Sequence, residues 1–370
     1  MTSEKDLYGA IRPYNDDEVP AALERLVNDS EFIGVFVAYF LRERPAWLKA
    51  IISPFLALYL RHKWSGLTSV DEVQREIKKY LDNILVSTTD GVSYSGLNRL
   101  DRNTPNLFIS NHRDIAMDPA LINYGLYTAK QQTARIAIGD NLLKKPCVNE
   151  LMRINKSFIV NRSSKGPREK MRVLRQLSAY IKHSLETKNS VWIAQREGRT
   201  KDGNDITDPA VLKMLYVEGK RRKLSFPDYM KTLKIIPISI SYENDPCDLA
   251  KVKELYEKEV YGKYEKSELE DIESIVHGIL GYKGRISVAF GEVIEDKFED
   301  PDSLAKAIDR QIHHLYKLFP INLLASEIED DSISNDTKSF LKKKLTDVPK
   351  RGRDYLIASY ANPAKNKNKN

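Results

Sequence analysis

The chain has 370 residues, of which 41% are hydrophobic and 30% are charged, so it can bury one large core or two smaller ones. Its 59 lysines and arginines only slightly outnumber its 52 aspartates and glutamates, and basic and acidic residues are interleaved without a recognisable recognition helix, which argues against a nucleic-acid-binding protein. Two cysteines, Cys147 and Cys247, are too few for a disulfide framework or a cysteine zinc site and indicate a reducing compartment.

The N-terminal part contains two apolar runs, at residues 32–41 (FIGVFVAYFL) and 47–60 (WLKAIISPFLALYL). The acidic, polar segment before them has no signal-peptide pattern, so secretion is not expected. Neither run reaches the ~18 to 20 apolar residues of a spanning helix. Their aromatic residues and flanking cations predict, within residues 1–65, a helical pair that lies in one face of a bilayer. Two buried helices of a soluble layer are the alternative.

Residues 66–320 alternate short apolar runs with longer helical patterns, which predicts an α/β domain with a largely parallel central sheet flanked by helices. The expected strands are NLFIS (106–110), RIAIG (135–139), SFIVN (157–161), SVWIA (190–194), LKIIPISISY (233–242) and GRISVAF (284–290). The expected helices cover residues 70–85, 168–187, 262–280 and 302–318. The tail, residues 321–370, is expected to contain a short charged helix near 332–347 and to end in a disordered segment (ANPAKNKNKN).

A histidine stands where a predicted strand ends, in the sequence SNHRDIAMDP. This is a favourable place for chemistry, because α/β folds open their sites at the carboxyl ends of their strands. His112 is the one histidine so placed; the other five lie in helical patterns, at His62, His183, His277, His313 and His314. A nearby carboxylate, Asp118 or Asp114, could orient His112 as a general base. No second ligand stands at a recognisable metal spacing, so no metal is expected.

Three further features follow predicted strands. The loop AQREGRTKDG carries three cations, Arg196, Arg199 and Lys201, which could hold a phosphate. Arg162 follows the strand SFIVN, and Pro237 lies within an apolar run, which favours a strand start or bulge.

In this order the motifs resemble those of the glycerolipid acyltransferase family, which includes glycerol-3-phosphate and lysophosphatidic acid acyltransferases. The first block is Asn111-His112 through Asp118-Pro119, and the second runs from Phe158 to Arg162. The third is Glu197-Gly198-Arg199-Thr200, and the fourth contains Pro237. The family separates His from Asp by four residues, whereas here Met117 occupies that place and Asp118 follows it. If the loop contains a one-residue bulge, Asp118 is the carboxylate that orients His112; otherwise Asp114 has this role. The third block is one residue shorter than usual, and Arg196 replaces proline.

The resemblance implies an acyltransferase without cofactors. His112, oriented by Asp118, would take the proton of an acceptor hydroxyl, which attacks the thioester of acyl-CoA or acyl carrier protein without an acyl-enzyme. The implied acceptor is lysophosphatidic acid or a glycerol-phosphate-type lipid. The implied substrate-binding residues are Asn111, Arg113, Arg162, Arg196, Glu197, Gly198, Arg199, Thr200 and Lys201. The expected place is the cytoplasmic face of a phospholipid membrane, as a peripheral or monotopic protein.

Two other interpretations stay open. The same fold could exchange acyl groups between lipids or acylate another lipid acceptor, because only the acceptor pocket would differ. A catalytically inactive, membrane-bound lipid-binding protein would account for the altered spacing of the motifs. The sequence fixes neither the headgroup, the chain length nor the oligomeric state.

Overall fold

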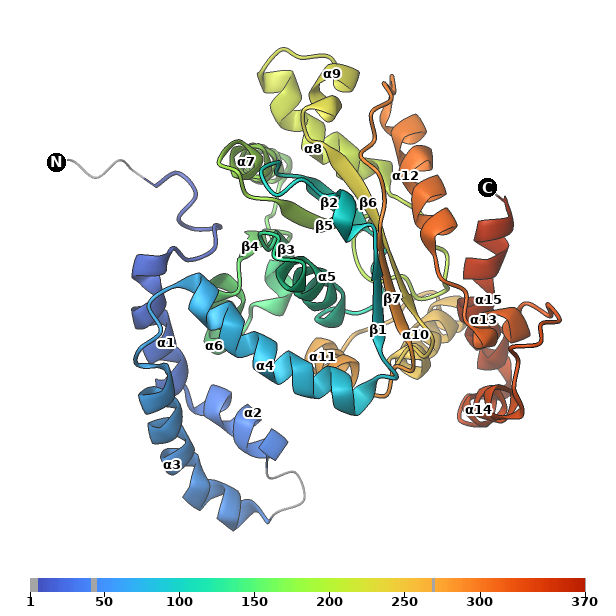
Figure 1. Cartoon of the computed structure of the whole chain (residues 1–370), viewed down its shortest axis with the longest axis horizontal. Helices are drawn as coiled ribbons and strands as arrows, with labels where there is room; N and C mark the ends of the chain where they lie inside the picture. Colours follow the sequence, from blue (N-terminus) through green and yellow to red (C-terminus); the bar gives the residue numbers. More distant parts are fainter. Residues whose placement is uncertain (1–5, 41–44, 268–269, 370) are drawn as a thin grey trace. The chain divides into compact units, whose positions relative to one another are not determined.

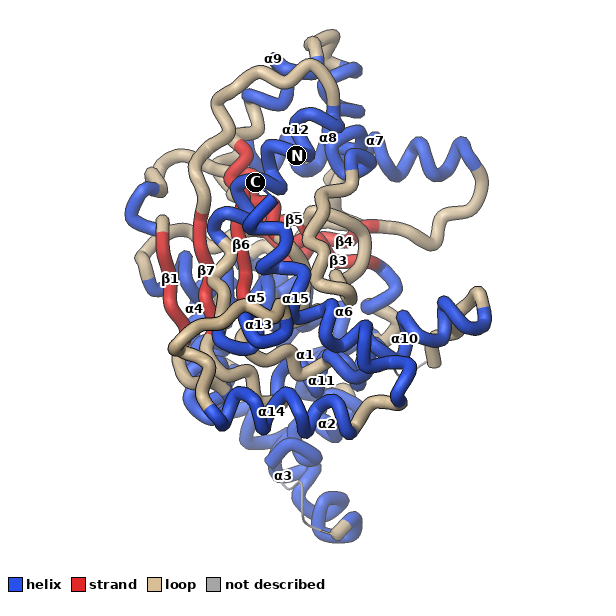
Figure 2. The backbone as a smooth tube through the Cα atoms, turned by 90° about the vertical axis from the view of Figure 1, so that its right-hand side faces the viewer, coloured by secondary structure: helices blue, strands red, loops and turns tan. Residues whose placement is uncertain are grey.

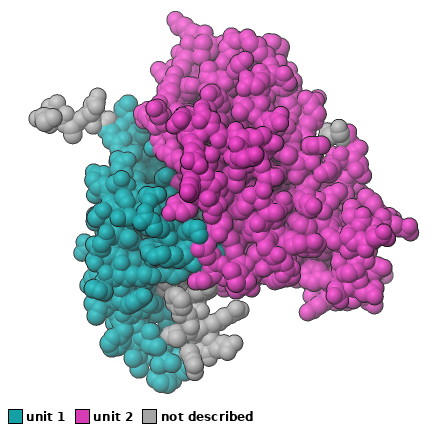
Figure 3. Space-filling view, in the orientation of Figure 1, with its two compact units in different colours: residues 1–81, 135–176 teal, residues 82–134, 177–370 magenta. Residues whose placement is uncertain are grey.

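The computed structural model describes residues 6–40, 45–267 and 270–369. The chain forms two compact units, shown in teal and magenta in Figure 3. Unit 1 comprises residues 1–81 and 135–176, and unit 2 comprises residues 82–134 and 177–370. This division differs from the predicted boundaries at 65/66 and 320/321. Residues 135–176 belong to the same unit as the N-terminal helices, and the C-terminal helices belong to the unit that contains the longest strand.

Within its described residues, unit 2 has the strand order β1-β7-β6-β2-β5. Figure 2 shows β1, β7 and β6 side by side. The strands of this unit are β1 (Val92–Ser95), β2 (Leu107–Ser110), β5 (Val191–Ala194), β6 (Ile235–Tyr242) and β7 (Ile286–Phe290). Strands β6 and β7 are antiparallel, while the pairs β1–β7, β2–β6 and β2–β5 are parallel. The predicted α/β class with a largely parallel sheet is therefore confirmed.

The strands β2 and β6 are buried along their whole length, which explains why they read as continuous apolar runs. Pro237 is the third residue of β6, pairs with Ile109 and accepts a hydrogen bond from Gly291 N on the β7 side. Regular pairing with β7 begins only at Ile238, so the missing N–H of the proline falls outside that ladder. The first strand, β1, was not predicted, because its side chains alternate between half-buried and exposed and its sequence is VSYS.

Helices cover the sheet of unit 2 on both faces, with α5 on one side and α12 on the other (Figure 1). Helix α12 packs on β6 and also contacts α8 and α15. The helices of this unit are α5 (Met117–Thr128), α8 (Pro209–Arg221), α9 (Phe226–Lys231), α10 (Asp248–Tyr261), α11 (Glu270–Leu280), α12 (Pro301–Leu315), α13 (Pro320–Ala325), α14 (Asn335–Thr346) and α15 (Arg353–Lys369). The helix expected over 262–280 is wrong at its start: α10 ends at Tyr261, Gly262 is left-handed, and residues 268–269 lie outside the described part.

The predicted disorder of the C-terminal tail is wrong over residues 361–369, which belong to α15. Ala361 and Ala364 are buried, and Tyr360 and Leu356 join an apolar cluster with residues of α10, α13 and α14 and with Val348. Small side chains let this helix approach its neighbours closely, so tertiary packing overrides a polar composition. The last residue, Asn370, lies outside the described part.

Unit 1 consists of N-terminal helices and a parallel strand pair. Its helices are α1 (Val19–Asn28), α2 (Ser30–Phe40), α3 (Ala46–Trp64) and α6 (Pro146–Ile154), and its strands are β3 (Arg135–Gly139) and β4 (Ser157–Val160). The chain passes between the units within α4 (Val70–Thr88), between residues 134 and 135, and within α7 (Pro167–Glu186). An apolar cluster formed by Leu23, Leu26, Phe32, Leu60, Trp64 and their neighbours joins α1, α2 and α3. The end of the first predicted apolar run, Leu41, lies outside the described residues.

Helix α3 has an unusual surface. Trp47, Ile51, Phe55 and Leu58 expose 64%, 53%, 68% and 62% of their area, and their spacing of three or four residues places them on one face of the helix. Within the described ranges, no helix is both long enough and apolar enough to cross a membrane.

Candidate active site

The loop between β2 and α5, residues 111–116, is called the histidine loop below. It leaves the carboxyl end of β2, which lies between β5 and β6. Because β2 is fully buried and paired on both sides, the start of the loop is held firmly. The carboxyl edge of a central parallel strand is where α/β folds place their ligands.

His112 and Asp118 are in direct contact: Nδ1 of His112 lies 2.9 Å from Oδ2 of Asp118. The side chain of His112 keeps 14% of its area exposed, whereas Asp118 is fully buried. The same Oδ2 accepts hydrogen bonds from the backbone N–H groups of Arg113 and Asp114, at 2.6 and 2.9 Å. Its other oxygen, Oδ1, accepts the hydroxyl of Tyr242 at 2.7 Å. Four donors therefore fix the carboxylate, which in turn fixes the imidazole with Nε2 as its remaining polar atom.

Asp114, the other carboxylate of the motif, has a different task. Its Oδ1 accepts the backbone N–H groups of Ala116 and Met117, at 2.9 and 2.8 Å, at the start of α5. This turn contains the additional residue that separates His112 from Asp118, so the side chain of Asp114 stabilises the bulge in the motif. Burial, together with the nearby charge of Asp118, raises the pKa of Asp114 to about 6.

Asn111 and Arg113 flank His112, and their side chains bond inside the protein. Asn111 is fully buried, and its amide pairs with both backbone groups of Ile240 on β6, at 2.8 and 2.9 Å. Arg113 donates to Asp205 at 2.7 Å, and its guanidinium lies 5.6 Å from the ring centre of Tyr316. These contacts give both residues a supporting role for the histidine loop.

The loop after β5, residues 195–208, is called the cationic loop below. Thr200 N donates to the carbonyl of His112 at 2.7 Å, so this loop lies directly against the histidine loop. Arg196, Glu197 and Gly198 are exposed, and Gly198 adopts the left-handed conformation with φ +75°. The sequence-predicted neighbours of His112 in the third motif are thus brought together with it.

The three cations of the cationic loop differ in what surrounds them. Arg199 donates from Nη2 to Ser274 Oγ at 3.2 Å, and its Nη1 is buried without a partner. Lys201 donates to Glu254 at 2.6 Å, so its ammonium already has an acidic partner, which it shares with Lys258. The exposed Arg196 and the half-satisfied Arg199 are therefore the better placed of the three to receive an anion.

Arg162 lies in unit 1, two residues after the end of β4. Its backbone N–H donates to Asp140 Oδ1 at 3.1 Å, and Ser163 donates to the other oxygen of the same carboxylate from both its N–H and its hydroxyl. Asp140 therefore fixes the turn that presents Arg162 after the strand.

Two residues that bear on the site were not identified from the sequence. Tyr242 ends β6 and reaches Asp118 from 124 positions away; burial and the charge of Asp118 raise its pKa well above the usual range, so the phenol stays a donor. Lys251 of α10 donates from Nζ to the carbonyl of Arg113 at 2.7 Å. The contact of Lys251 with Arg113 depends on tertiary packing, so the sequence contains no local signal for it. The only general indication is that buried lysines are rare.

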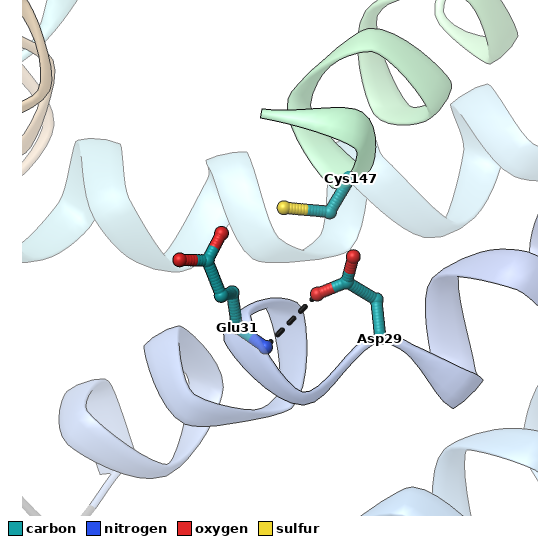
Figure 4. A group of neighbouring side chains, drawn as sticks. All are labelled: Asp29, Glu31 and Cys147. Atoms are coloured by element: carbon teal, nitrogen blue, oxygen red, sulfur yellow. Dashed lines mark hydrogen bonds between the residues drawn. The ribbon is translucent and has the colours of Figure 1, made fainter. Parts of the chain in front are cut away.

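A separate group in unit 1 brings together Asp29, Glu31 and Cys147 (Figure 4). Asp29 Oδ1 accepts the N–H groups of Glu31 and Phe32, at 2.9 and 3.0 Å, and so caps the start of α2. Glu31 pairs with Lys145 at 2.9 Å. Burial and the two carboxylates raise the pKa of the Cys147 thiol, which disfavours the thiolate that metals require. The contacts of this group are those of a helix cap.

Comparison with known proteins gives a match to a family model and similarity to solved structures. Residues 91–241 match the family model described as Acyltransferase, and this range contains every motif named above. The chain is also similar to the crystal structure of the 1-acyl-sn-glycerophosphate acyltransferase PlsC from Thermotoga maritima, with 14% identity and a TM-score of 0.37 over 80% of this chain and 92% of that one. No curated protein has a significant match to the sequence.

Proposed function

We propose that this chain, whose residues 91–241 match the family model described as Acyltransferase, moves a fatty acyl group from a thioester to a lipid hydroxyl. The donor is acyl-CoA or acyl carrier protein, and the acceptor is lysophosphatidic acid or a glycerol-phosphate-type lipid. The observation that carries the proposal is the contact between His112 and the fully buried Asp118 at the carboxyl edge of the sheet.

The chemistry follows from the two nitrogens of His112. With Nδ1 bonded to Asp118, Nε2 accepts the proton of the acceptor hydroxyl, and Asp118 stabilises the imidazolium that forms. The hydroxyl oxygen attacks the thioester carbonyl, a C–O bond forms and the C–S bond breaks. The proton then passes from His112 to the departing thiolate. The protein groups that these steps use are His112 and Asp118, and no acyl-enzyme is required.

The cationic loop would bind the phosphate of the acceptor. Thr200 fastens this loop to the carbonyl of His112, which keeps Arg196 and Arg199 near the imidazole. The unpartnered Nη1 of Arg199 supports this role, because a buried guanidinium N–H gains most from an anionic partner. Arg162 is a substrate-binding residue of the family motif, and for this chain that role stays a prediction.

Helix α3 would attach the protein to a phospholipid surface, as a peripheral or monotopic protein of the cytoplasmic face. Its exposed row of Trp47, Ile51, Phe55 and Leu58 is apolar and partly aromatic, and residues 61–63 (RHK) follow in its last turn. A helix with this arrangement lies in the interface, with its apolar face among the acyl chains and its cations at the headgroups.

The function is tested by acyl transfer with purified full-length protein in detergent. Radiolabelled acyl-CoA and acyl carrier protein are offered separately against glycerol-3-phosphate, lysophosphatidic acid and neutral lysolipids. We expect transfer that requires a thioester and prefers acceptors with a phosphate. Transfer from a phospholipid donor without a thioester would replace this proposal with lipid exchange, and no transfer from any donor would favour an inactive lipid-binding protein.

Membrane attachment is tested separately by sedimentation with vesicles of phosphatidylcholine and phosphatidylglycerol. Burial of a large apolar side chain contributes ~2 kcal/mol, so Trp47→Ser and Phe55→Ser should each weaken binding about 30-fold. Val86→Ser, which changes another highly exposed apolar residue, is the matched control and should leave binding unchanged. Equal binding by all variants would refute the role of α3.

A further inference from the structure

Lys251 is a buried lysine, 3% exposed, that touches the backbone next to His112. Its ammonium donates to the carbonyl of Arg113 at 2.7 Å and pairs with Asp245. Burial alone would raise the pKa of Asp245, but the charge of Lys251 prevails and holds it below the usual value. Burying an ion pair is costly, so this one stabilises little by itself, and its geometry instead constrains the histidine loop.

The same ion pair is connected to the C-terminal helices. The hydroxyl of Tyr360, on α15, accepts the backbone N–H of Asp245 at 3.2 Å and donates to Asp248 at 2.7 Å. Lys344, on α14, donates to the same oxygen of Asp248 at 2.6 Å. A buried polar network therefore runs from the carbonyl of the histidine loop, through α10, to the last two helices of the chain.

Helix α15 also supports the cationic loop directly. Asn362 donates from Nδ2 to the carbonyl of Asp202 at 2.6 Å. Gly203 lies so close to α15 that a Cβ atom there would stand 2.4 Å from the carbonyl oxygen of Ser359. The carbonyl of Gly203 in turn accepts from Arg113 at 3.4 Å, which links this support to the histidine loop.

The helix that makes these contacts is itself firmly packed. Leu356, Tyr360 and Ala361 are buried, at 4% exposure or less, in one apolar cluster with Phe319 and Ile321. A rigid element that bonds to two loops of a site can fix their geometry more closely than the loops fix themselves.

We propose that Lys251 and Tyr360 are positioning residues for the reaction: α10 and α15 hold the histidine and cationic loops at the distances that the transfer requires. Neither residue touches His112 itself: Lys251 acts through the carbonyl of Arg113, and Tyr360 acts through Asp245 and Asp248. The kinetic part of this inference rests on the proposed acyltransferase activity, whereas its structural part does not.

The test uses the full-length protein and variants that remove polar contacts without leaving a lone buried charge. The double variant Lys251→Met with Asp245→Asn removes both charges of the ion pair, and Tyr360→Phe removes only a hydroxyl. Tyr355→Phe is the matched control, because this half-buried tyrosine packs on the same apolar cluster from the same helix. For each protein, kcat and KM are measured well below the unfolding midpoint, together with amide hydrogen exchange of residues 108–118 and 196–205.

We expect the double variant to lose about tenfold or more in kcat, with KM for both substrates changed less than twofold, because small displacements of reacting groups are costly. Tyr360→Phe should lose at least threefold, and Tyr355→Phe should match the wild type. Exchange of residues 108–118 should accelerate in the first two variants only. A lower unfolding midpoint with unchanged kcat and unchanged exchange would overturn the proposal. If the wild type transferred no acyl group, the proposed function would fail, and the exchange rates alone would decide whether the network positions the loops.

Discussion

Replacing Asp118 with asparagine would remove its charge and keep its shape. The amide oxygen of the new side chain can still accept from His112, Arg113 N and Asp114 N, as the present Oδ2 does. Its NH₂ group would face Tyr242, whose hydroxyl can accept as well as donate. The site should therefore fold as before, with the carboxylate charge as the one thing lost.

The size of the effect follows from the geometry. A contact of 2.9 Å between Nδ1 and Oδ2 separates the charge centres of imidazolium and carboxylate by ~4 Å. At an effective dielectric constant of about 20, their attraction is about 4 kcal/mol. Because the imidazolium forms during the reaction, this attraction belongs mainly to the transition state, and its loss should lower kcat about a thousandfold.

The assay is acyl transfer to lysophosphatidic acid at saturating acyl-CoA, with thermal unfolding followed in parallel. Asp114→Asn is the matched control: this side chain caps α5 without touching His112, and asparagine can cap equally well, so its kcat should fall less than about threefold. An Asp118→Asn variant that kept more than a tenth of the wild-type kcat would refute the reasoning, as would an equal loss in Asp114→Asn.

Three further results are expected. Burial raises the pKa of Asp114 to about 6, from about 4 in the unfolded chain, so the protonated carboxyl stabilises the fold below pH ~4 and this contribution is lost as the pH rises through ~6. The unfolding temperature of Asp114→Asn should therefore rise relative to that of the wild type between pH 4 and 7. A difference that did not change with pH would contradict this. Gly278→Ala would place a Cβ 2.0 Å from the carboxylate of Asp114 and should lower both unfolding temperature and kcat, whereas Gly34→Ala, with open space around it, should not. Arg199→Met should raise KM for a phosphate-bearing acceptor about tenfold, but Lys201→Met, which loses an ammonium already paired, less than threefold; the reverse order would exchange their roles.

Sequence patterns located the sheet and the histidine because both depend on local features. The buried strands β2 and β6 are uninterrupted apolar runs, and His112 and Asp118 are only six positions apart. Strand β1 was not predicted, because half of its side chains face solvent and its sequence therefore lacks an apolar run. The choice between Asp118 and Asp114 also needed the structure, since only the turn after His112 shows which carboxylate faces the ring.

The contacts that hold the site in place could not be predicted, because they join residues that are distant in the sequence. Tyr242 meets Asp118 only through the pairing of β6 with β2, and Lys251 meets the histidine loop only through the placement of α10. The segment ANPAKNKNKN, which forms the end of α15, was expected to be disordered because its composition is polar, yet Ala361 and Ala364 are buried. Packing of this kind leaves no periodic pattern in the sequence.

The most direct test of the account is the rate of thiol release from acyl-CoA in the presence of lysophosphatidic acid, compared between wild type and His112→Ala. General base catalysis contributes a factor of ~10² to 10⁴, so we expect the variant to lose at least a hundredfold in kcat while its unfolding temperature stays near that of the wild type. A folded His112→Ala protein that released thiol and formed acylated product at the wild-type rate would contradict the claim that His112 is the base.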